Sequence, residues 1–301
     1  MRSCRLVCAL LVAAMACGTA SAGPEEAAKV FAAGKVLLAK GDFDGAAKAF
    51  KEAAAADPDN ADYFQEAALL KRVMNLRKQI AEEKDPEAWQ AMARALYGYY
   101  RQNGIQGEAL TLAQALHAKA GTGESAALLA DAYLAADQNE AAATLLAGLK
   151  EDAVTLRTTA LRGVALARLG KMDEAKALAA KFALPKECDD AALCVDAARL
   201  YALTGDKDKA LTTLKCALEC TPTNQLAAVR AEAKACKDLA AVAGSEEFTK
   251  VLATESKAVG GCGKCPSKDK CAGGEKKDAG CGSQEKSGDK KDAGCQEHEK
   301  K

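Results

Sequence analysis

Cysteines near the C-terminus are the residues of this sequence best suited to chemistry. Cys262 and Cys265 form a Cys-x-x-Cys pair, and Cys271 follows six residues later. Two thiolates at this spacing can bind one soft metal ion, and the lysines between them favour the reactive thiolate form. No second close pair follows, as a structural zinc site requires, and the spacing differs from that of iron–sulfur ferredoxins. Three interpretations stay open: a weak metal or thiol-redox site, a covalent tether to a partner, or cysteines without a function.

Other chemistry is sparse in this chain. His117 and His298 are its two histidines, and it has no nucleophile elbow, metalloprotease motif or phosphate-binding loop. His117 lies in a stretch with helical periodicity, where packing is a simpler role than general-base catalysis. Lys plus Arg and Asp plus Glu number 42 each, so overall charge does not favour nucleic acid as a partner. The sequence predicts neither an enzyme nor a nucleic-acid-binding protein, and no cofactor other than the soft metal ion considered above.

Residues 1–22 have the pattern of a secretory signal peptide. Two arginines precede a short apolar stretch, and Ala20 and Ala22 are small residues at the spacing that signal peptidase accepts. The stretch is shorter than the roughly 20 apolar residues of a transmembrane helix, and no later run is longer. Cleavage would leave Gly23 as the first residue, and a lipid anchor at Cys17 is the less favoured alternative. We therefore expect export to the periplasm, the cell envelope or the extracellular space.

The elements that would present these residues are expected to be helices. Hydrophobic residues make up 49% of the chain but aromatic residues only 4%, so alanine and leucine dominate the apolar content and favour helix. Residues 27–60 contain two amphipathic stretches, separated by Gly41 and Asp42 and closed by a proline. Small side chains along both stretches would let two antiparallel helices approach closely.

This pattern resembles the tetratricopeptide repeat, a helix–turn–helix unit of 34 residues. The residues that match its packing positions are Gly34, Ala46, Phe50, Ala53 and Pro58 in the first unit and Ala198, Tyr201, Ala210, Ala217 and Pro222 in the last. Weaker copies lie between them, with Ala109, Ala141 and Ala175 at the position of Ala210. The resemblance implies an all-α fold, a right-handed α-solenoid of about six helix pairs over residues 23–257.

Three segments depart from the repeat. Residues 61–84 lack a convincing turn, so they form either one long helix or a degenerate repeat that turns near Asn75. After Thr223 we expect a closing helix and then a short helix capped by Ser245. Residues 258–301 are rich in Gly, Lys, Asp, Glu, Ser and Cys and poor in large apolar side chains. Such a composition cannot bury enough surface to fold, which predicts a disordered tail.

A second group of cysteines falls in or beside the last complete repeat. The candidates for disulfide bonds are Cys188, Cys194, Cys216 and Cys220. Antiparallel packing brings the start of one helix near the end of its partner, which favours a bridge from Cys194 to Cys216 or from Cys188 to Cys220. An exported protein can form such bonds, and small buried thiols are the alternative.

The resemblance also implies a binding surface, because the first helix of each repeat lines a concave groove in this family. The residues at the groove positions are Lys35, Arg94, Arg101, Arg157, Arg168 and Arg199, with Asp196 opposing them. These side chains are expected to project into solvent as a basic stripe that attracts an acidic or C-terminal segment. Ordinary solvated helix faces are the alternative. The asparagines that clamp a C-terminal carboxylate in chaperone-binding members are absent.

The function that these features favour is an exported, non-catalytic scaffold that binds a partner protein or peptide in its concave groove. The alternative is a metal- or thiol-handling protein in which the solenoid presents the cysteine-rich tail. The metal content of protein purified under reducing conditions distinguishes the two.

Overall fold

The computed structural model describes residues 23–185 and 190–258, and all of them belong to one compact unit. Within these residues it contains thirteen α-helices, three short 3₁₀ helices and no strand. None of the described helices is long and apolar enough to cross a bilayer. The predicted all-α solenoid of helical repeats is confirmed, while residues 1–22 and 259–301 lie outside the described part.

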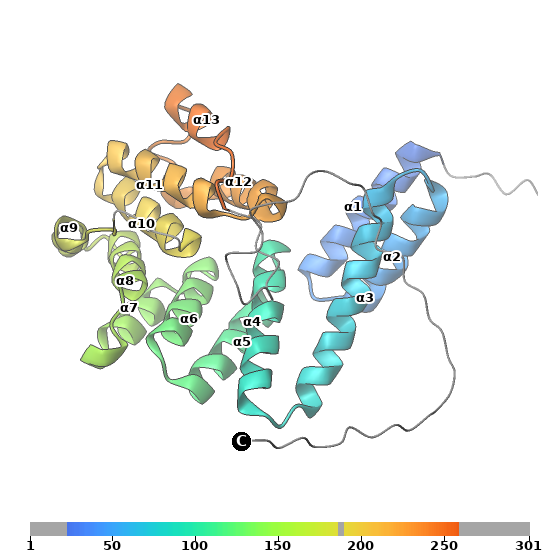
Figure 1. Cartoon of the computed structure of the whole chain (residues 1–301), viewed down its shortest axis with the longest axis horizontal. Helices are drawn as coiled ribbons and strands as arrows, with labels where there is room; N and C mark the ends of the chain where they lie inside the picture. The colour runs from blue at the N-terminus through green and yellow to red at the C-terminus, as the bar shows by residue number, and fades with distance from the viewer. Residues whose placement is uncertain (1–22, 186–189, 259–301) are drawn as a thin grey trace, which may run out of the picture. The chain divides into compact units, whose positions relative to one another are not determined.

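Five helix pairs form most of the unit, and Figure 1 shows them in chain order. Within each pair the two helices pack on each other. The pairs are α1 (Pro24–Ala39) with α2 (Phe43–Ala56), α4 (Pro86–Gln102) with α5 (Gln106–Ala120), α6 (Gly123–Ala135) with α7 (Asn139–Ala147), α8 (Leu156–Arg168) with α9 (Met172–Lys181), and α10 (Ala191–Thr204) with α11 (Lys207–Cys220). The first helices α6, α8 and α10 also stack on one another, as a solenoid requires.

A single long helix, α3 (Ala61–Glu82), separates the first two pairs. It begins at Asn60, whose side chain accepts a hydrogen bond from the backbone N–H of Asp62, and it continues without a turn through Asn75. No glycine or proline interrupts residues 61–82, so nothing in the sequence ends the helix earlier. The long-helix alternative is therefore confirmed, and the expected six pairs are five in the described chain.

The turn inside each pair uses a residue in the left-handed region. Positive φ angles occur one or two residues after the end of each first helix, at Gly41, Gly104, Asp137, Gly170 and Gly205. Glycine adopts this conformation without steric cost, and aspartate is among the few other residues that tolerate it. The spacing of these residues therefore sets the register of the repeats.

A buried alanine follows each of these turn residues by five positions. These alanines are Ala46, Ala109, Ala142, Ala175 and Ala210, each at most 1% exposed. Ala210 and three of the others occupy the packing position that the sequence predicts. In the α6–α7 pair the prediction is wrong by one position. The predicted residue, Ala141, is half-buried, and its neighbour Ala142 is fully buried. The register after Asp137 places Ala142, not Ala141, on the face of α7 that meets α6.

This difference gives a matched test of the register. Ala142→Leu should destabilise the protein by about 1–3 kcal/mol, because three extra carbon atoms must enter a closed core. Ala141→Leu should change the free energy of unfolding by less than about 0.5 kcal/mol, since the side chain has access to solvent. Urea unfolding of both variants measures the two effects. Equal losses would contradict the register.

Gly34 and Gly163 let their helices approach a neighbouring helix closely. A Cβ added at Gly34 would lie 2.7 Å from the Phe50 ring, and one at Gly163 would lie 2.6 Å from the Leu200 side chain. Ala53, Ala198, Tyr201 and Ala217 are buried as well. Pro58 and Pro222 are exposed instead, and each follows the end of a second helix that it prevents from continuing.

The chain after α11 returns across the first helices. It forms η2 (Thr223–Gln225), α12 (Leu226–Ala235), η3 (Lys237–Leu239) and α13 (Glu246–Leu252). As expected, Ser245 caps the last helix by accepting a hydrogen bond from the backbone N–H of Phe248. Within this segment η3 packs on α10, whereas α12 makes sparse contacts with α11. The segment therefore contributes to the surface on which the groove residues lie.

Candidate functional site

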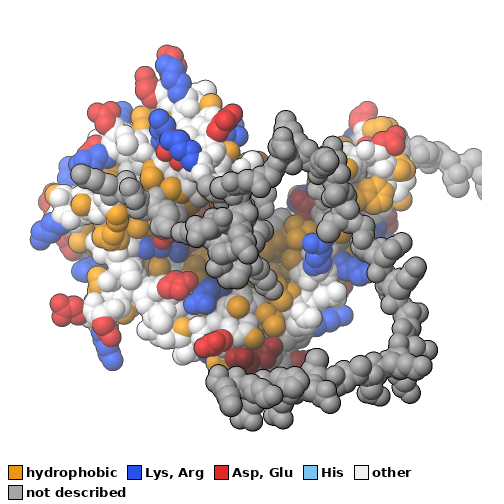
Figure 2. Space-filling model, in the orientation of Figure 1, with side chains coloured by type: hydrophobic (Ala, Val, Ile, Leu, Met, Phe, Trp, Pro, Cys, Tyr) orange, Lys and Arg blue, Asp and Glu red, His pale blue; other side chains and the backbone are white. Residues whose placement is uncertain are grey.

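The six basic groove candidates all form ion pairs within the described chain. Three of the six pairs join a residue on one first helix to a residue on the next. The partners are Glu66 for Lys35, Glu124 for Arg94, Asp131 for Arg101, Asp196 for Arg157, and Asp238 for both Arg168 and Arg199, with N–O distances of 2.8 to 3.1 Å. Charges of both signs are likewise interspersed over the face shown in Figure 2. The inner face is therefore a set of paired charges and not a bare basic stripe.

Arg199 is the centre of this arrangement and contacts three carboxylates. Its Nε donates to Asp238 Oδ2 at 2.8 Å, and its second nitrogen contacts Asp196 Oδ1 at 3.0 Å and Asp131 Oδ1 at 3.3 Å. The side chain is 8% exposed. One guanidinium on α10 thus connects α6 and η3 through fixed charges, with Asp196 on its own helix.

Three further arginines complete this group. Arg101 and Arg157 donate from Nε to Asp131 and Asp196, each at 2.9 Å. Arg168 binds Asp238 with two parallel hydrogen bonds of 2.8 and 3.0 Å, the bidentate geometry that suits a guanidinium and a carboxylate. We call these residues the Arg199 cluster. Its members are Arg101, Asp131, Arg157, Arg168, Asp196, Arg199 and Asp238.

The arginines lower the pKa of two of the three buried carboxylates, whereas burial raises the pKa of Asp196 despite Arg157 and Arg199. Burial alone would raise the pKa of Asp131, but Arg101 and Arg199 lower it to about 2. The pKa of Asp238 is also lowered: its burial is outweighed by hydrogen bonds and charge from Arg168 and Arg199. Both groups are therefore anionic at neutral pH, and each depends on the cations around it.

The expectation that the groove side chains project into solvent as a basic stripe is wrong. Arg199 does not project into solvent but is buried among three carboxylates, and Asp196 is not the only acidic residue that opposes the arginines. The sequence reasoning missed Asp131 and Asp238. Asp131 could have been found, because in the corrected register it falls at the same groove position as Lys35 and Arg199. Asp238 gives no such signal, because it follows the last repeat.

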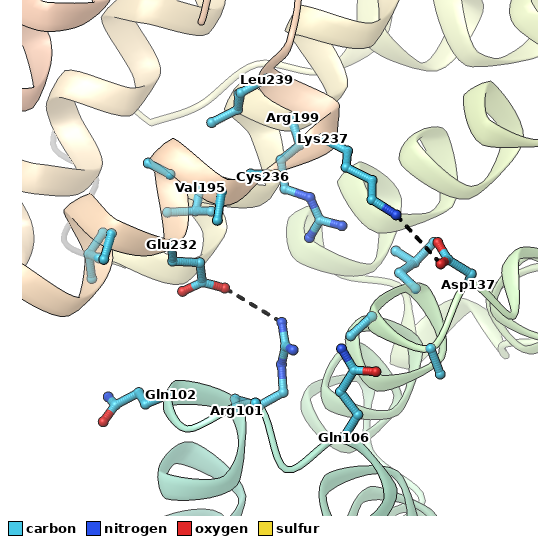
Figure 3. A pocket seen from close by; sticks show the side chains of 18 of the residues that line it. Arg101, Gln102, Gln106, Asp137, Val195, Arg199, Glu232, Cys236, Lys237 and Leu239 are labelled. Atoms are coloured by element: carbon cyan, nitrogen blue, oxygen red, sulfur yellow. Dashed lines mark ion pairs between the residues drawn. The ribbon is translucent and has the colours of Figure 1, made fainter. Parts of the chain in front are cut away.

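An open cleft lies beside the cluster, between the end of α4, the start of α5, the end of α6 and the helix α12 (Figure 3). Its volume is about 850 Å³. Leu110, Leu134 and Val229 contribute apolar surface, and Gln102 and Gln106 place side-chain amides at its mouth. We call it the Arg101 cleft. An apolar lining with a few polar groups is typical of sites that hold a ligand or a peptide segment.

Two ion pairs bridge this cleft. Glu232 on α12 lies 3.5 Å from a terminal nitrogen of Arg101, and Lys237 lies 3.8 Å from Asp137 (Figure 3). These contacts are longer and more exposed than those inside the Arg199 cluster, so they hold the two walls together only weakly.

Two of the cysteine candidates lie where α10 packs on α11. Cys194 and Cys216, on α10 and α11, have Sγ atoms 3.7 Å apart. Cys220 lies at the end of α11, and Cys188 lies outside the described residues, as do Cys262, Cys265 and Cys271. The structure thus brings one predicted pair within reach of a bond.

We expect Cys194 and Cys216 to form a disulfide under oxidising conditions. The sulfurs need to approach from 3.7 Å to about 2.0 Å, and the closed loop, with its ends 22 residues apart, would add about 3 kcal/mol of stability. Mass spectrometry of peptides digested without reduction should recover the two cysteines joined. Recovery of both as thiols from protein kept in oxidant would contradict the expectation.

His117 has a structural contact. Its Nδ1 lies 3.1 Å from Ser125 Oγ, which in turn donates to the Thr122 carbonyl and completes the cap of α6. The hydroxyl is thus committed to a helix terminus. This arrangement supports the packing role that the sequence suggests for His117.

A comparison with protein-family models agrees with the repeat pattern of the first helix pair. Residues 30–60 match the family model of the tetratricopeptide repeat. Two similar solved structures are a thermophilic TPR protein of Thermus thermophilus, with 21% identity, and a tetratricopeptide repeat protein of Parabacteroides merdae, with 14% identity. They cover 72% and 75% of this chain and 98% and 97% of their own, with TM-scores of 0.35 and 0.36. No curated protein sequence gives a match.

Proposed function

Because this chain is a tetratricopeptide-repeat protein, we propose that it is an exported, non-catalytic scaffold that holds a segment of a partner protein in the Arg101 cleft. Repeats of this family serve as platforms for proteins or peptides. The observation that carries the proposal is the cleft itself, an opening of about 850 Å³ on the inner side of the repeats. Its apolar walls and exposed amides suit a peptide, whose backbone needs hydrogen-bond partners.

The Arg199 cluster supports this proposal by holding the cleft in shape. The cluster connects α4, α6, α8, α10 and η3 through buried ion pairs. Fixed walls reduce the conformational entropy that binding would otherwise cost. The arginines of the inner face thus act on the partner mainly by shaping the site, and Arg101 is the member that also borders the opening.

A substitution that fills the cleft tests the proposal directly. Gly107 borders the cleft at the start of α5, and a Cβ there meets no atom within 4 Å, so a large side chain would occupy the opening without disturbing the fold. Gly98, on α4 and away from the cleft, has equally open surroundings and provides the matched control. Gly107→Trp should abolish partner capture from envelope extract, and Gly98→Trp should retain it. Undiminished capture by Gly107→Trp would refute the proposed site.

Export is the second part of the proposal and rests on the leader pattern of residues 1–22. The mature protein should begin at Gly23 and carry no lipid. Intact-mass measurement of protein recovered from the cell envelope checks this. A mass that retains the leader, or that includes a diacylglycerol on Cys17, would contradict it.

The alternative function, handling of a metal ion or of thiols by the tail, depends on Cys262, Cys265 and Cys271. These residues lie outside the described structure, so the alternative stays a prediction from the sequence.

A further inference from the structure

The helix α12 is held less firmly than the segments on either side of it. Of its residues, Leu226 and Ala233 are buried, whereas α10 is buried along most of its length. The next residues are anchored strongly: Asp238 binds Arg168 and Arg199, and Leu239 is fully buried. One wall of the Arg101 cleft is therefore a helix with few contacts of its own, fixed at η3.

Arg101 divides its contacts between this wall and the cluster. Its Nε donates to the buried Asp131 at 2.9 Å, while a terminal nitrogen faces Glu232 at 3.5 Å. The Glu232 side chain is 60% exposed, so water competes with this second contact. The same terminal nitrogen also lies 3.5 Å from Asp131 Oδ1, so Asp131 holds the guanidinium in place while the longer, exposed contact with Glu232 can be exchanged for another carboxylate.

We propose that α12 is a displaceable wall and that Glu232 occupies the place of a partner's carboxylate on Arg101. The partner is an amphipathic helical segment with small apolar residues and one carboxylate, as α12 itself presents. When such a segment enters, its carboxylate binds the terminal nitrogens of Arg101 and Glu232 moves into solvent. Charge is conserved in this exchange, because one carboxylate replaces another beside the same guanidinium. This inference rests on the proposed function and adds the chemical class of the partner.

The test uses the full chain and a labelled peptide of residues 226–235, blocked at both ends, with fluorescence anisotropy as the readout. Glu232→Gln in the protein removes the internal competitor. The peptide should therefore bind this variant roughly three to five times more tightly than the wild type, a factor typical of one exposed ion pair. The same peptide with glutamine in place of its glutamate should bind both proteins more weakly than the original peptide does, because it brings no carboxylate to Arg101. Glu255→Gln, which makes the same charge change outside the cleft, should bind as the wild type does.

A second measurement tests whether α12 is mobile. Backbone hydrogen exchange in α12 should be faster than in α10 in the wild type, and faster still in Glu232→Gln. Equal peptide affinities for the two proteins, no detectable peptide binding, or α12 exchange as slow as that of α10 would each overturn the inference. If Gly107→Trp still abolishes capture of the partner, such a result contradicts the displaceable wall but not the proposed binding site. The two hypotheses can therefore fail separately.

Discussion

Arg199→Met should destabilise the protein by about 3–5 kcal/mol, the usual cost of removing one partner from a buried charge network. The substitution keeps an unbranched side chain of similar length but leaves Asp131, Asp196 and Asp238 with fewer cations in a buried environment. Arg162→Met, on α8 and outside the cluster, is the matched control and should cost less than about 1 kcal/mol. Chemical denaturation followed by circular dichroism measures both.

The pH dependence of this loss identifies its cause. In the wild type, the folded pKa of Asp131, about 2, lies below its ordinary value of 3.8. Its contribution to stability is therefore complete above pH 3.8 and is lost as the pH falls through 2. Without Arg199 the pKa values of the carboxylates in the folded protein should rise. Lowering the pH should therefore reduce the free energy of unfolding less in the variant than in the wild type. The difference in unfolding free energy should narrow between about pH 5 and about pH 2. A constant difference would show that Arg199 acts through packing alone.

Asp238→Ala is expected to cost about 2–3 kcal/mol, because it removes three hydrogen bonds to charged groups and leaves Arg168 without its bidentate partner. The loss of stability should be confined to the C-terminal segment. Hydrogen exchange should accelerate in α12 and η3 and stay unchanged in α1 and α2, which carry no residue of the cluster. Asp208→Ala, an exposed aspartate on α11, provides the control with the same change of charge. Uniform acceleration throughout the chain would contradict the proposed anchoring of the C-terminal segment.

The repeats could be predicted from the sequence because their packing depends on local residues. Glycine at the turns and small residues at fixed distances from them are readable from the sequence, and the buried Ala46 and Ala210 confirm that pattern. The error at Ala141 has a simple origin: residues 141–143 are all alanine, so side-chain type does not distinguish the buried position. Only the five-residue distance from the turn, here at Asp137, identifies Ala142.

The groove could be predicted only in part. The positions of Arg101, Arg157, Arg168 and Arg199 on the inner face follow from the repeat register, and all four meet in one cluster. Their partners do not follow from it, because Asp238 lies 70 residues from Arg168 in a segment without a repeat signal. A solvated basic stripe and a buried ion-pair network have the same appearance on helical wheels. The difference arises from tertiary contacts that bring η3 onto the first helices.

Photo-crosslinking from inside the cleft tests the central claim, that a partner occupies the Arg101 cleft. A benzophenone amino acid is placed at Gln106, which borders the cleft, or at Gln114, which is exposed two turns further along α5. Irradiation of envelopes that contain the full chain should join the Gln106 variant to a partner polypeptide and leave the Gln114 variant uncrosslinked. Crosslinks from Gln114 without any from Gln106 would place the partner on another surface and contradict the proposal.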